Sequence, residues 1–214
     1  MWGALVKKNN NVITLACTLI GLQPFSSYGE SEYFIEPFGG YSFATSDFKA
    51  QNTQNKNQSK LKVNETGHYG LILGTQTPDP GNIYLLYSHL DTKITNSNTT
   101  DISVNSLNID YFHLGGSLYY PHENWNNIVT VSLGLTQFRP NNQLNTETRF
   151  SMGFGVGAEY SITRFLAFTA GIRSYATIVE ANNNFLCDAN QCIWQINSDL
   201  FWQTQANLGV KFIF

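Results

Sequence analysis

The sequence predicts an all-β protein, an eight-stranded antiparallel up-and-down transmembrane β-barrel. Three observations support this prediction. Apolar and polar residues alternate through eight separate segments, and the connections between these segments are alternately long and short. Of the 214 residues only 13% are charged, whereas 14% are aromatic. That composition favours a surface that does not face water everywhere.

The first element is a signal peptide, expected over residues 1–29. Two lysines precede the apolar stretch VITLACTLIGL (12–22), and small residues precede a cleavage point after Gly29. The apolar stretch is too short to cross a bilayer as a helix. Export would therefore remove Cys17 with the leader and leave one barrel domain, residues 30–214. A lipoprotein signal ending at Cys17 is the alternative.

Eight alternating segments follow the leader, with apolar residues at every second position as in half-exposed strands. Beyond residue 30 no apolar run reaches the roughly 18 residues that a transmembrane helix needs. The expected strands are residues 32–45, 66–76, 83–94, 104–120, 127–139, 148–160, 165–179 and 199–214.

The connections fall into two kinds, which indicates a barrel with different ends. The polar stretches 46–65, 95–103, 140–147 and 180–198 are expected to be loops, mostly long. The short joints are 77–82, 121–125 and 161–164. Long loops at one end and tight turns at the other are typical of membrane barrels, and both termini then lie at the short-turn end.

Side chains on the two faces of a strand form two rows, and these rows differ in size and polarity as a membrane barrel requires. In residues 148–160, the row from Phe150 to Tyr160 is apolar, and the opposite row holds three glycines between Arg149 and Glu159. Small side chains fit the narrow interior of an eight-stranded barrel, and large apolar ones fit a lipid-facing band. A secreted soluble barrel or sandwich, whose apolar rows would point inward, is the alternative.

Two segments alternate less regularly. YLLYSHL (84–90) has leucines on both rows, and FHLGGSLYY (112–120) changes phase around Gly115 and Gly116. A β-bulge there would reset the register. His113 is therefore not assigned to a face.

Six charged residues are expected on inward rows, where they must be paired or hydrated. They are Glu36, Asp110, Arg149, Glu159, Arg173 and Lys211. We interpret them as a plug of ion pairs that closes the lumen. A narrow gated pore is the alternative.

The remaining cysteines, Cys187 and Cys192, form an even set in an exported chain and are expected to be joined by a disulfide in the last long loop. Two thiols with no histidine nearby make a poor zinc site, so no metal is expected. The glycines of GFGVG (153–157) occupy alternate strand positions and form no phosphate loop. No cofactor is expected.

A lipase-type catalytic site would need Ser, His and an acid within hydrogen-bond reach. The candidates are His89 beside Ser88 and Asp91, and His113 near Asp110 and Ser117. Adjacent strand residues point to opposite faces, so Ser88 and His89 cannot pair directly. We therefore expect no enzyme. The formal net charge of −3 gives no basic field for nucleic acid.

The chain ends on QTQANLGVKFIF (203–214), whose apolar row finishes at Phe212 and Phe214. This ending, a signal peptide and eight such strands resemble the small outer-membrane β-barrels of Gram-negative bacteria, in the OmpA/OmpW-like group. Three internal segments, YLLYSHLDT, LNIDYFHLGGSLYY and ETRFSMGFGVGAEY, look like one uncharacterised family of outer-membrane β-barrel domains.

The resemblance implies an outer-membrane location and a chain that spans the membrane many times. It also implies that Phe212 and Phe214 resemble the signal read by the barrel assembly machinery. Outer-membrane lipids and lipopolysaccharide are then the surroundings of the barrel wall, and the long loops are available to extracellular ligands. The resemblance implies no reaction.

Three functions follow as hypotheses. The first is a non-enzymatic outer-membrane barrel with a structural or loop-display role and a charge-plugged lumen. The second is a narrow channel for small or hydrophobic solutes. The third is a lipid-acting enzyme.

Overall fold

The computed structural model describes residues 32–44, 48–51, 58–96, 105–141, 145–179, 185–188, 191–194 and 200–214. The expected signal peptide, residues 1–29, lies outside these residues. Regular structure in the described part of the chain consists of β-strands. No helix within it is long and apolar enough to cross a membrane.

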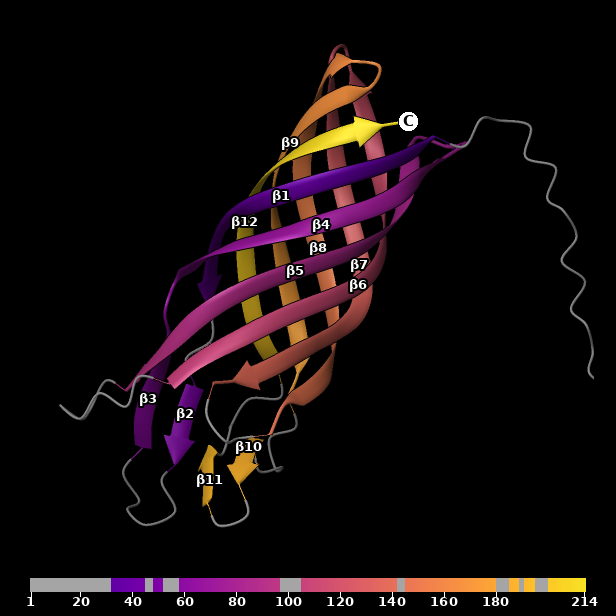
Figure 1. Ribbon diagram of the computed structural model, residues 1–214. Coiled ribbons are helices and arrows are strands. Elements are labelled where there is room, and N and C mark those ends of the chain that lie inside the picture. The colour runs from indigo at the N-terminus through magenta and orange to yellow at the C-terminus, as the bar shows by residue number, and fades with distance from the viewer. Residues whose placement is uncertain are drawn as a thin grey trace, which may run out of the picture.

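Eight long antiparallel strands form one closed barrel (Figure 1). They are β1 (Tyr33–Ala44), β4 (Thr66–Thr77), β5 (Gly81–Asn96), β6 (Asn105–His122), β7 (Trp125–Pro140), β8 (Glu147–Thr163), β9 (Leu166–Ile178) and β12 (Leu200–Ile213). All eight expected strands are confirmed, with each end within three residues of its predicted position. Alternation of apolar and polar residues, even where it is irregular, is thus a sufficient signal for their number and approximate length.

The barrel closes between its first and last strands. β1 pairs with β4 on one side and with β12 on the other, where Phe34 lies opposite Ile213 and Ile35 opposite Phe212. The indigo and yellow ribbons therefore run side by side (Figure 1). Every other long strand pairs with its sequence neighbours, as the up-and-down topology requires. Closure removes the free sheet edges that would otherwise pair with other chains.

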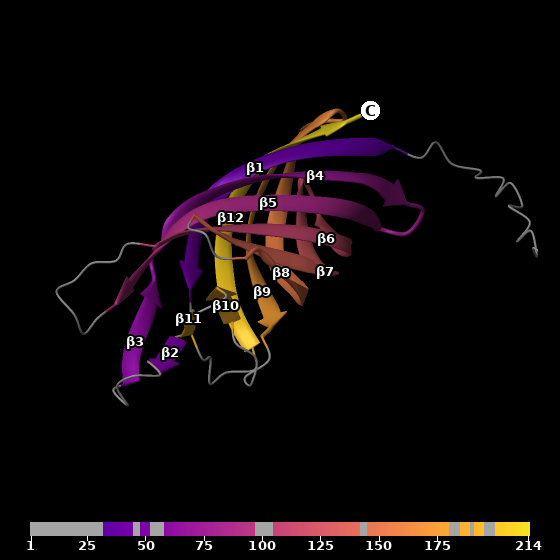
Figure 2. The same ribbon diagram turned by 60° about the horizontal axis from the view of Figure 1, so that its bottom comes forward.

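The two ends of the barrel differ, as Figure 2 also shows. At the turn end, residues 78–80, 123–124 and 164–165 join strands directly. At the opposite end, which we call the loop end, two hairpins extend beyond the wall, β2 (Phe48–Gln51) with β3 (Gln58–Val63) and β10 (Phe185–Asp188) with β11 (Gln191–Trp194). The sequence predicted only loops there, because these polar segments lack the alternation that marks a wall strand.

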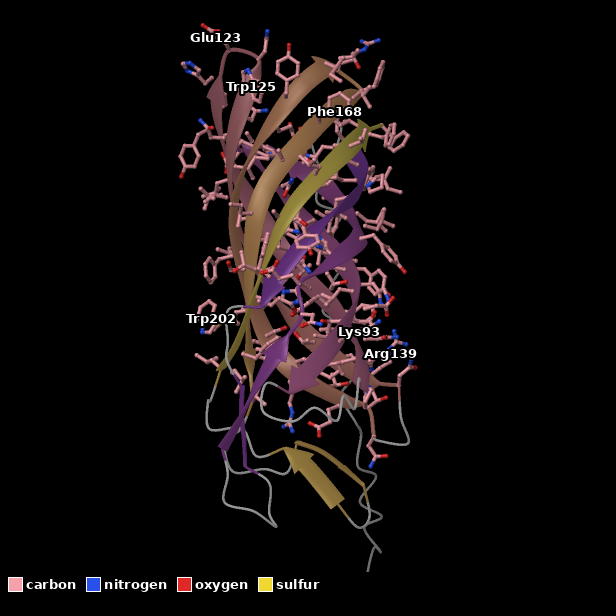
Figure 3. The ribbon with its side chains drawn as sticks, turned by 90° about the vertical axis from the view of Figure 1, so that its left-hand side faces the viewer. Lys93, Glu123, Trp125, Arg139, Phe168 and Trp202 are labelled. Carbon is pink, nitrogen blue, oxygen red and sulfur yellow. The ribbon has the colours of Figure 1, made fainter. Side chains whose placement is uncertain are left out.

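The outward rows carry a band of large apolar side chains. Exposed members include Leu85, Leu114, Leu133, Met152 and Ile172. Trp125 and Phe168 lie on the wall near the turn end, and Trp202 lies toward the loop end (Figure 3). A mid-wall aliphatic band flanked by aromatic residues is the pattern of a lipid-facing surface. The predicted outward direction of the apolar rows is therefore confirmed.

The inward rows contain more bulk than the sequence predicted. Among their buried residues are Phe34, Phe38, Ile72, Tyr84, Leu86, Leu90, Leu107, Ile109, Tyr111, Phe138, Tyr175 and Phe201. The glycines make room for them. A Cβ atom on Gly115 would lie 2.6 Å from the phenol ring of Tyr84, and one on Gly153 would lie 3.3 Å from the ring of Tyr175. Small and large residues thus lie side by side on neighbouring strands.

The predicted change of phase at Gly115 and Gly116 is wrong. β6 keeps one continuous register with β5 and β7 through both glycines, and no bulge occurs there. Gly116 simply takes an outward position between Leu114 and Leu118. Among the described wall strands, the one shift of register occurs instead between Ser161 and Thr163, in the pairing of β8 with β9. The sequence misled here because a glycine stands where the lipid-facing row has an apolar residue.

Candidate functional site

The lumen is filled at its middle by two stacked tyrosines. Tyr111 of β6 and Tyr175 of β9 are fully buried, with ring centroids 4.1 Å apart and ring planes 17° apart. The Tyr111 hydroxyl donates to Oε1 of Gln203, whose Nε2 donates to the Ser42 hydroxyl at 2.8 Å. The stack is thereby tied to β12 and β1 across the barrel.

His113 anchors a network of hydroxyl groups beside the stack. Its Nδ1 lies 3.0 Å from the Ser132 hydroxyl, and its Nε2 lies 2.9 Å from the Ser151 hydroxyl. The chain of bonds continues from Ser151 to Thr136 at 2.8 Å and from Thr136 to Thr177 at 3.0 Å. Such satisfied polar networks hold side chains in one arrangement. The structure therefore assigns His113, which the sequence left open, to the inward face.

Between this network and the loop end, apolar side chains fill the lumen, and we call them the apolar cap. Its members are Leu90, Leu107, Ile109, Phe138, Val179 and Phe201. The rings of Phe138 and Phe201 meet edge to face at 5.9 Å. These residues cover the tyrosine pair on the side of the loop end.

On the turn side of the stack, one ion pair crosses the lumen. Lys211 of β12 bonds the Glu159 carboxylate of β8, and both side chains are buried, at 3% and 7% exposure. The Lys211 ammonium also donates to the Tyr119 hydroxyl at 2.8 Å. Nearby, Glu36 accepts a hydrogen bond of 2.7 Å from Thr169. Charge pairing thus closes one level of the lumen, while tyrosines and apolar side chains close the others.

A cavity of about 70 Å³ lies between the ion pair and the tyrosine stack. Its lining includes Glu36, Asn82, Tyr84, Arg173 and Lys211. The Arg173 guanidinium carbon lies 5.9 Å from the ring centroid of Tyr84, and Nε of Arg173 has no hydrogen-bond partner among the described residues. The cavity is large enough to hold water beside this nitrogen.

Five of the six predicted interior charges lie on inward rows. They are Glu36, Arg149, Glu159, Arg173 and Lys211. Arg149 lies toward the loop end, where it donates to Glu147 at 2.8 Å. The structure brings Glu159, Lys211 and Glu36 near one cavity edge, and Arg173 lines the same cavity.

The sixth prediction, an inward Asp110, is wrong. Asp110 lies opposite His89 and Gln137 on the outward rows, and its neighbours Ile109 and Tyr111 take the inward positions. The sequence misled because both rows carry apolar residues at this point of β6. A count from the outward residues Phe112 and Leu114 by steps of two would have found the correct face.

Asp110 is nevertheless only 1% exposed, because three side chains cover it on the outer wall. His89 Nδ1 lies 2.7 Å from its Oδ1, the Tyr87 hydroxyl donates to the same oxygen at 2.9 Å, and Arg139 Nη2 donates to Oδ2. We call Tyr87, His89, Asp110 and Arg139 the outer-wall cluster. It lies near the loop end, where Arg139 is seen in Figure 3.

Neither histidine site forms a catalytic triad. His113 has two hydroxyl partners but no carboxylate, and His89 has carboxylate partners, Asp110 and Asp91, but no hydroxyl nucleophile among its described contacts. Ser88 points inward, where it bonds Gln205 at 3.3 Å, so it cannot serve His89. Among the described residues, no group of three His, Cys, Asp or Glu side chains is arranged to hold a metal ion.

The structure places the two cysteines and the two C-terminal phenylalanines but does not test the roles predicted for them. Cys187 of β10 lies directly opposite Cys192 of β11, but their side chains are outside the described set, so the disulfide stays a prediction. Phe212 and Phe214 lie on the outward row of β12, and the Phe214 N–H donates to the Tyr33 carbonyl at 2.9 Å. Their role in assembly also stays a prediction.

Sequence reasoning missed the tyrosine stack and the apolar cap. Tyr175 stands on the polar row of its strand, which indicates an inward side chain. No local pattern, however, indicates that Tyr111, on a strand three places away around the wall, would stack on it.

Comparison with known proteins identifies one family of sequences. The sequence model of the family described as outer membrane protein beta-barrel domain matches residues 12–214. A search among curated proteins gives no match.

Several solved structures share the fold. The outer membrane protein OprG from Pseudomonas aeruginosa is 9% identical with a TM-score of 0.62, over 86% of this chain and 96% of that chain. Neisserial surface protein A is 12% identical with a TM-score of 0.53, over 85% and 97%. The outer membrane protein AlkL is 11% identical with a TM-score of 0.53, over 100% and 97%. At such low identity the likeness shows the fold alone.

Proposed function

This chain belongs to the outer membrane protein β-barrel domain family, and from that premise we propose that it is a non-enzymatic barrel with a closed lumen that presents its loops outside the cell. Its location is the Gram-negative outer membrane. The role that fits this geometry is structural support of the membrane or display of the loop-end hairpins.

One observation carries the proposal: side chains fill the lumen at three successive levels. The Lys211–Glu159 pair lies toward the turn end, the Tyr111–Tyr175 stack lies in the middle, and the apolar cap lies toward the loop end. An eight-stranded barrel has an interior just wide enough for side chains to fill, so these layers leave little space for a solute.

The loop-end hairpins support a display role. β2 with β3 and β10 with β11 extend past the wall on the side of the long connections (Figure 2). β3 also pairs with the end of β5, so that the first hairpin continues the barrel wall. Membrane barrels place their long connections outside the cell.

A narrow channel is the second candidate, and the cavity beside Arg173 favours it. A cationic side chain beside a cavity in the lumen is a usual feature of a polar passage, and joint movement of the two tyrosines and the apolar cap would connect this cavity to the loop end. The lipid-acting enzyme has less support, because neither histidine has both an acid and a hydroxyl nucleophile among its described contacts.

Planar-bilayer recording tests the closed lumen. We expect little or no steady conductance from the purified, folded protein. Large and steady openings would contradict the proposal and favour the channel. Incubation of the same preparation with lipopolysaccharide, followed by mass spectrometry of its lipid anchor, tests the absence of enzymatic activity, and a loss or transfer of an acyl chain would contradict it.

A further inference from the structure

The outer-wall cluster is a group of charges on a surface that otherwise faces lipid. Directly toward the turn end lie the apolar side chains of Phe112, Leu135 and Phe150, which are opposite one another on neighbouring strands. A buried carboxylate on this wall is costly unless it is paired and its surroundings are polar. Whether these charges face hydrocarbon or lipid headgroups therefore depends on the position of the cluster along the wall.

That position is the outer edge of the hydrocarbon band. Asp110 is ten residues from Tyr120, the aromatic residue at the turn end of the outward row of β6. With a rise of about 3.3 Å per residue and the usual tilt of about 40°, this separation spans roughly 25 Å of membrane. The apolar band of an outer-membrane barrel has about this height. The cluster thus lies level with the headgroups of the outer leaflet.

The cluster presents an oriented cation to those headgroups. Asp110 holds one terminal nitrogen of Arg139, whose side chain is still 46% exposed, so the remaining N–H groups of the guanidinium face outward. His89 and Tyr87 fix Asp110 from the other side. A guanidinium with a fixed plane can donate two parallel hydrogen bonds to a phosphate.

A second cation and several neutral polar groups lie on the adjoining rows. Arg139 is opposite Asn108, which is opposite Asp91, and the exposed Lys93 follows two residues later on β5. Lys93 and Arg139 both project from the wall near the loop end (Figure 3). Gln137 and Thr148 lie on the row of Asp110. Amide and hydroxyl groups beside two cations match a headgroup that carries sugar hydroxyls as well as phosphate.

We propose that Arg139 and Lys93, with Arg139 oriented by Asp110, form a binding site for the phosphorylated sugar headgroup of an outer-leaflet glycolipid. The site rests on the outer-membrane location and not on the closed lumen, so conductance and lipid binding test the two proposals separately. The exposed Asp91 carboxylate also faces this ligand, and a hard divalent cation would bridge it to a phosphate oxygen. Chelation should therefore weaken binding.

The test uses the full folded protein in nanodiscs that contain lipopolysaccharide, phosphatidylglycerol or phosphatidylcholine, with bound lipid measured by native mass spectrometry after mild delipidation. We expect retained lipopolysaccharide and little retained phosphatidylglycerol. Arg139→Gln with Lys93→Gln should lower retention about thirtyfold, since each interfacial cation contributes about fivefold to binding of an anionic lipid. Arg164→Gln, an exposed arginine at the turn end, is the matched control and should change nothing.

Asp110→Asn separates an oriented site from general attraction. The change removes a negative charge, so simple electrostatics predicts tighter binding, whereas loss of the group that orients Arg139 predicts weaker binding. We expect weaker binding, with heat-modifiable gel mobility confirming that the variant is folded. Three results would each overturn the proposal: unchanged retention in the double variant, equal retention of phosphatidylglycerol, and full displacement by millimolar inorganic phosphate.

Discussion

Tyr111 and Tyr175 stack face to face in the centre of the barrel, with their ring centroids 4.1 Å apart, although they come from β6 and β9. Replacing both with alanine removes this layer of the plug. We expect brief, small conductance events in planar bilayers that the unmodified protein lacks. Tyr120→Ala, which removes an exposed aromatic from the outward row of β6, should leave the recordings silent. Equal silence in the double variant would mean that the ion pair and the apolar cap close the lumen without the tyrosines.

The buried Lys211–Glu159 pair should be far more important to stability than the partly exposed Arg149–Glu147 pair, whose side chains are 25% and 17% exposed. Lys211→Met leaves Glu159 without its cation, which costs about 3–5 kcal/mol if the site is dry and less if water enters. The double change to Met at both positions should recover most of this loss. Urea unfolding in lipid vesicles measures it. Arg149→Met is the control, with a cost of about 0–1 kcal/mol.

Cys187 and Cys192 should be joined in the exported protein. They are directly opposite in an antiparallel pair, where Cα atoms are about 4.5–5.5 Å apart, a separation that a disulfide spans. The closed loop is short, so its stabilisation is about 2 kcal/mol at most and local to the β10–β11 hairpin. Thiol labelling without reductant should find no reactive cysteine in the mature chain. Two labelled thiols would refute the pairing.

Phe214→Ala should reduce the amount of barrel that reaches the outer membrane more than it reduces the stability of the folded barrel. The side chain is exposed on the outward row, so its removal opens no cavity, whereas an assembly factor would read it before insertion. Outer-membrane yield and heat-modifiable mobility report the two effects separately. Ile213→Ala, on the inward row beside it, is the comparison. Normal yield from Phe214→Ala would show that the last residues serve only as part of a strand and not as an assembly signal.

Glu123→Gly should stabilise the turn between β6 and β7. Glu123 has φ of 52°, the single positive φ among the described non-glycine residues. It is the first of two residues between the paired His122 and Trp125, the position where a type II′ hairpin turn favours glycine. Relief of strain, offset in part by the freedom of glycine in the unfolded chain, should gain roughly 0.5 kcal/mol in urea unfolding. Asn124→Gly, at a residue without positive φ, should bring no gain.

The sequence by itself determines the number of wall strands, their limits and the direction of most side chains. A strand alternates its faces residue by residue, so a row such as Phe150 to Tyr160 carries its orientation in local order alone. The same reasoning predicts that Glu36, Arg149, Glu159, Arg173 and Lys211 share the inward face. These are properties of single strands, and they need no knowledge of which strand is adjacent.

Only the tertiary structure decides what those side chains meet. The stack of Tyr111 on Tyr175, the bond of Lys211 to Glu159 and the outward placement of Asp110 with Arg139 all depend on cross-strand register and on closure of β1 against β12. Where both rows of a strand are apolar, as around Ile109 and Tyr111, local composition does not tell which row enters the lumen, and the face has to be counted from a clearer part of the strand. Packing completes the assignment, because a narrow barrel has room for a large ring where a glycine or another ring lies beside it.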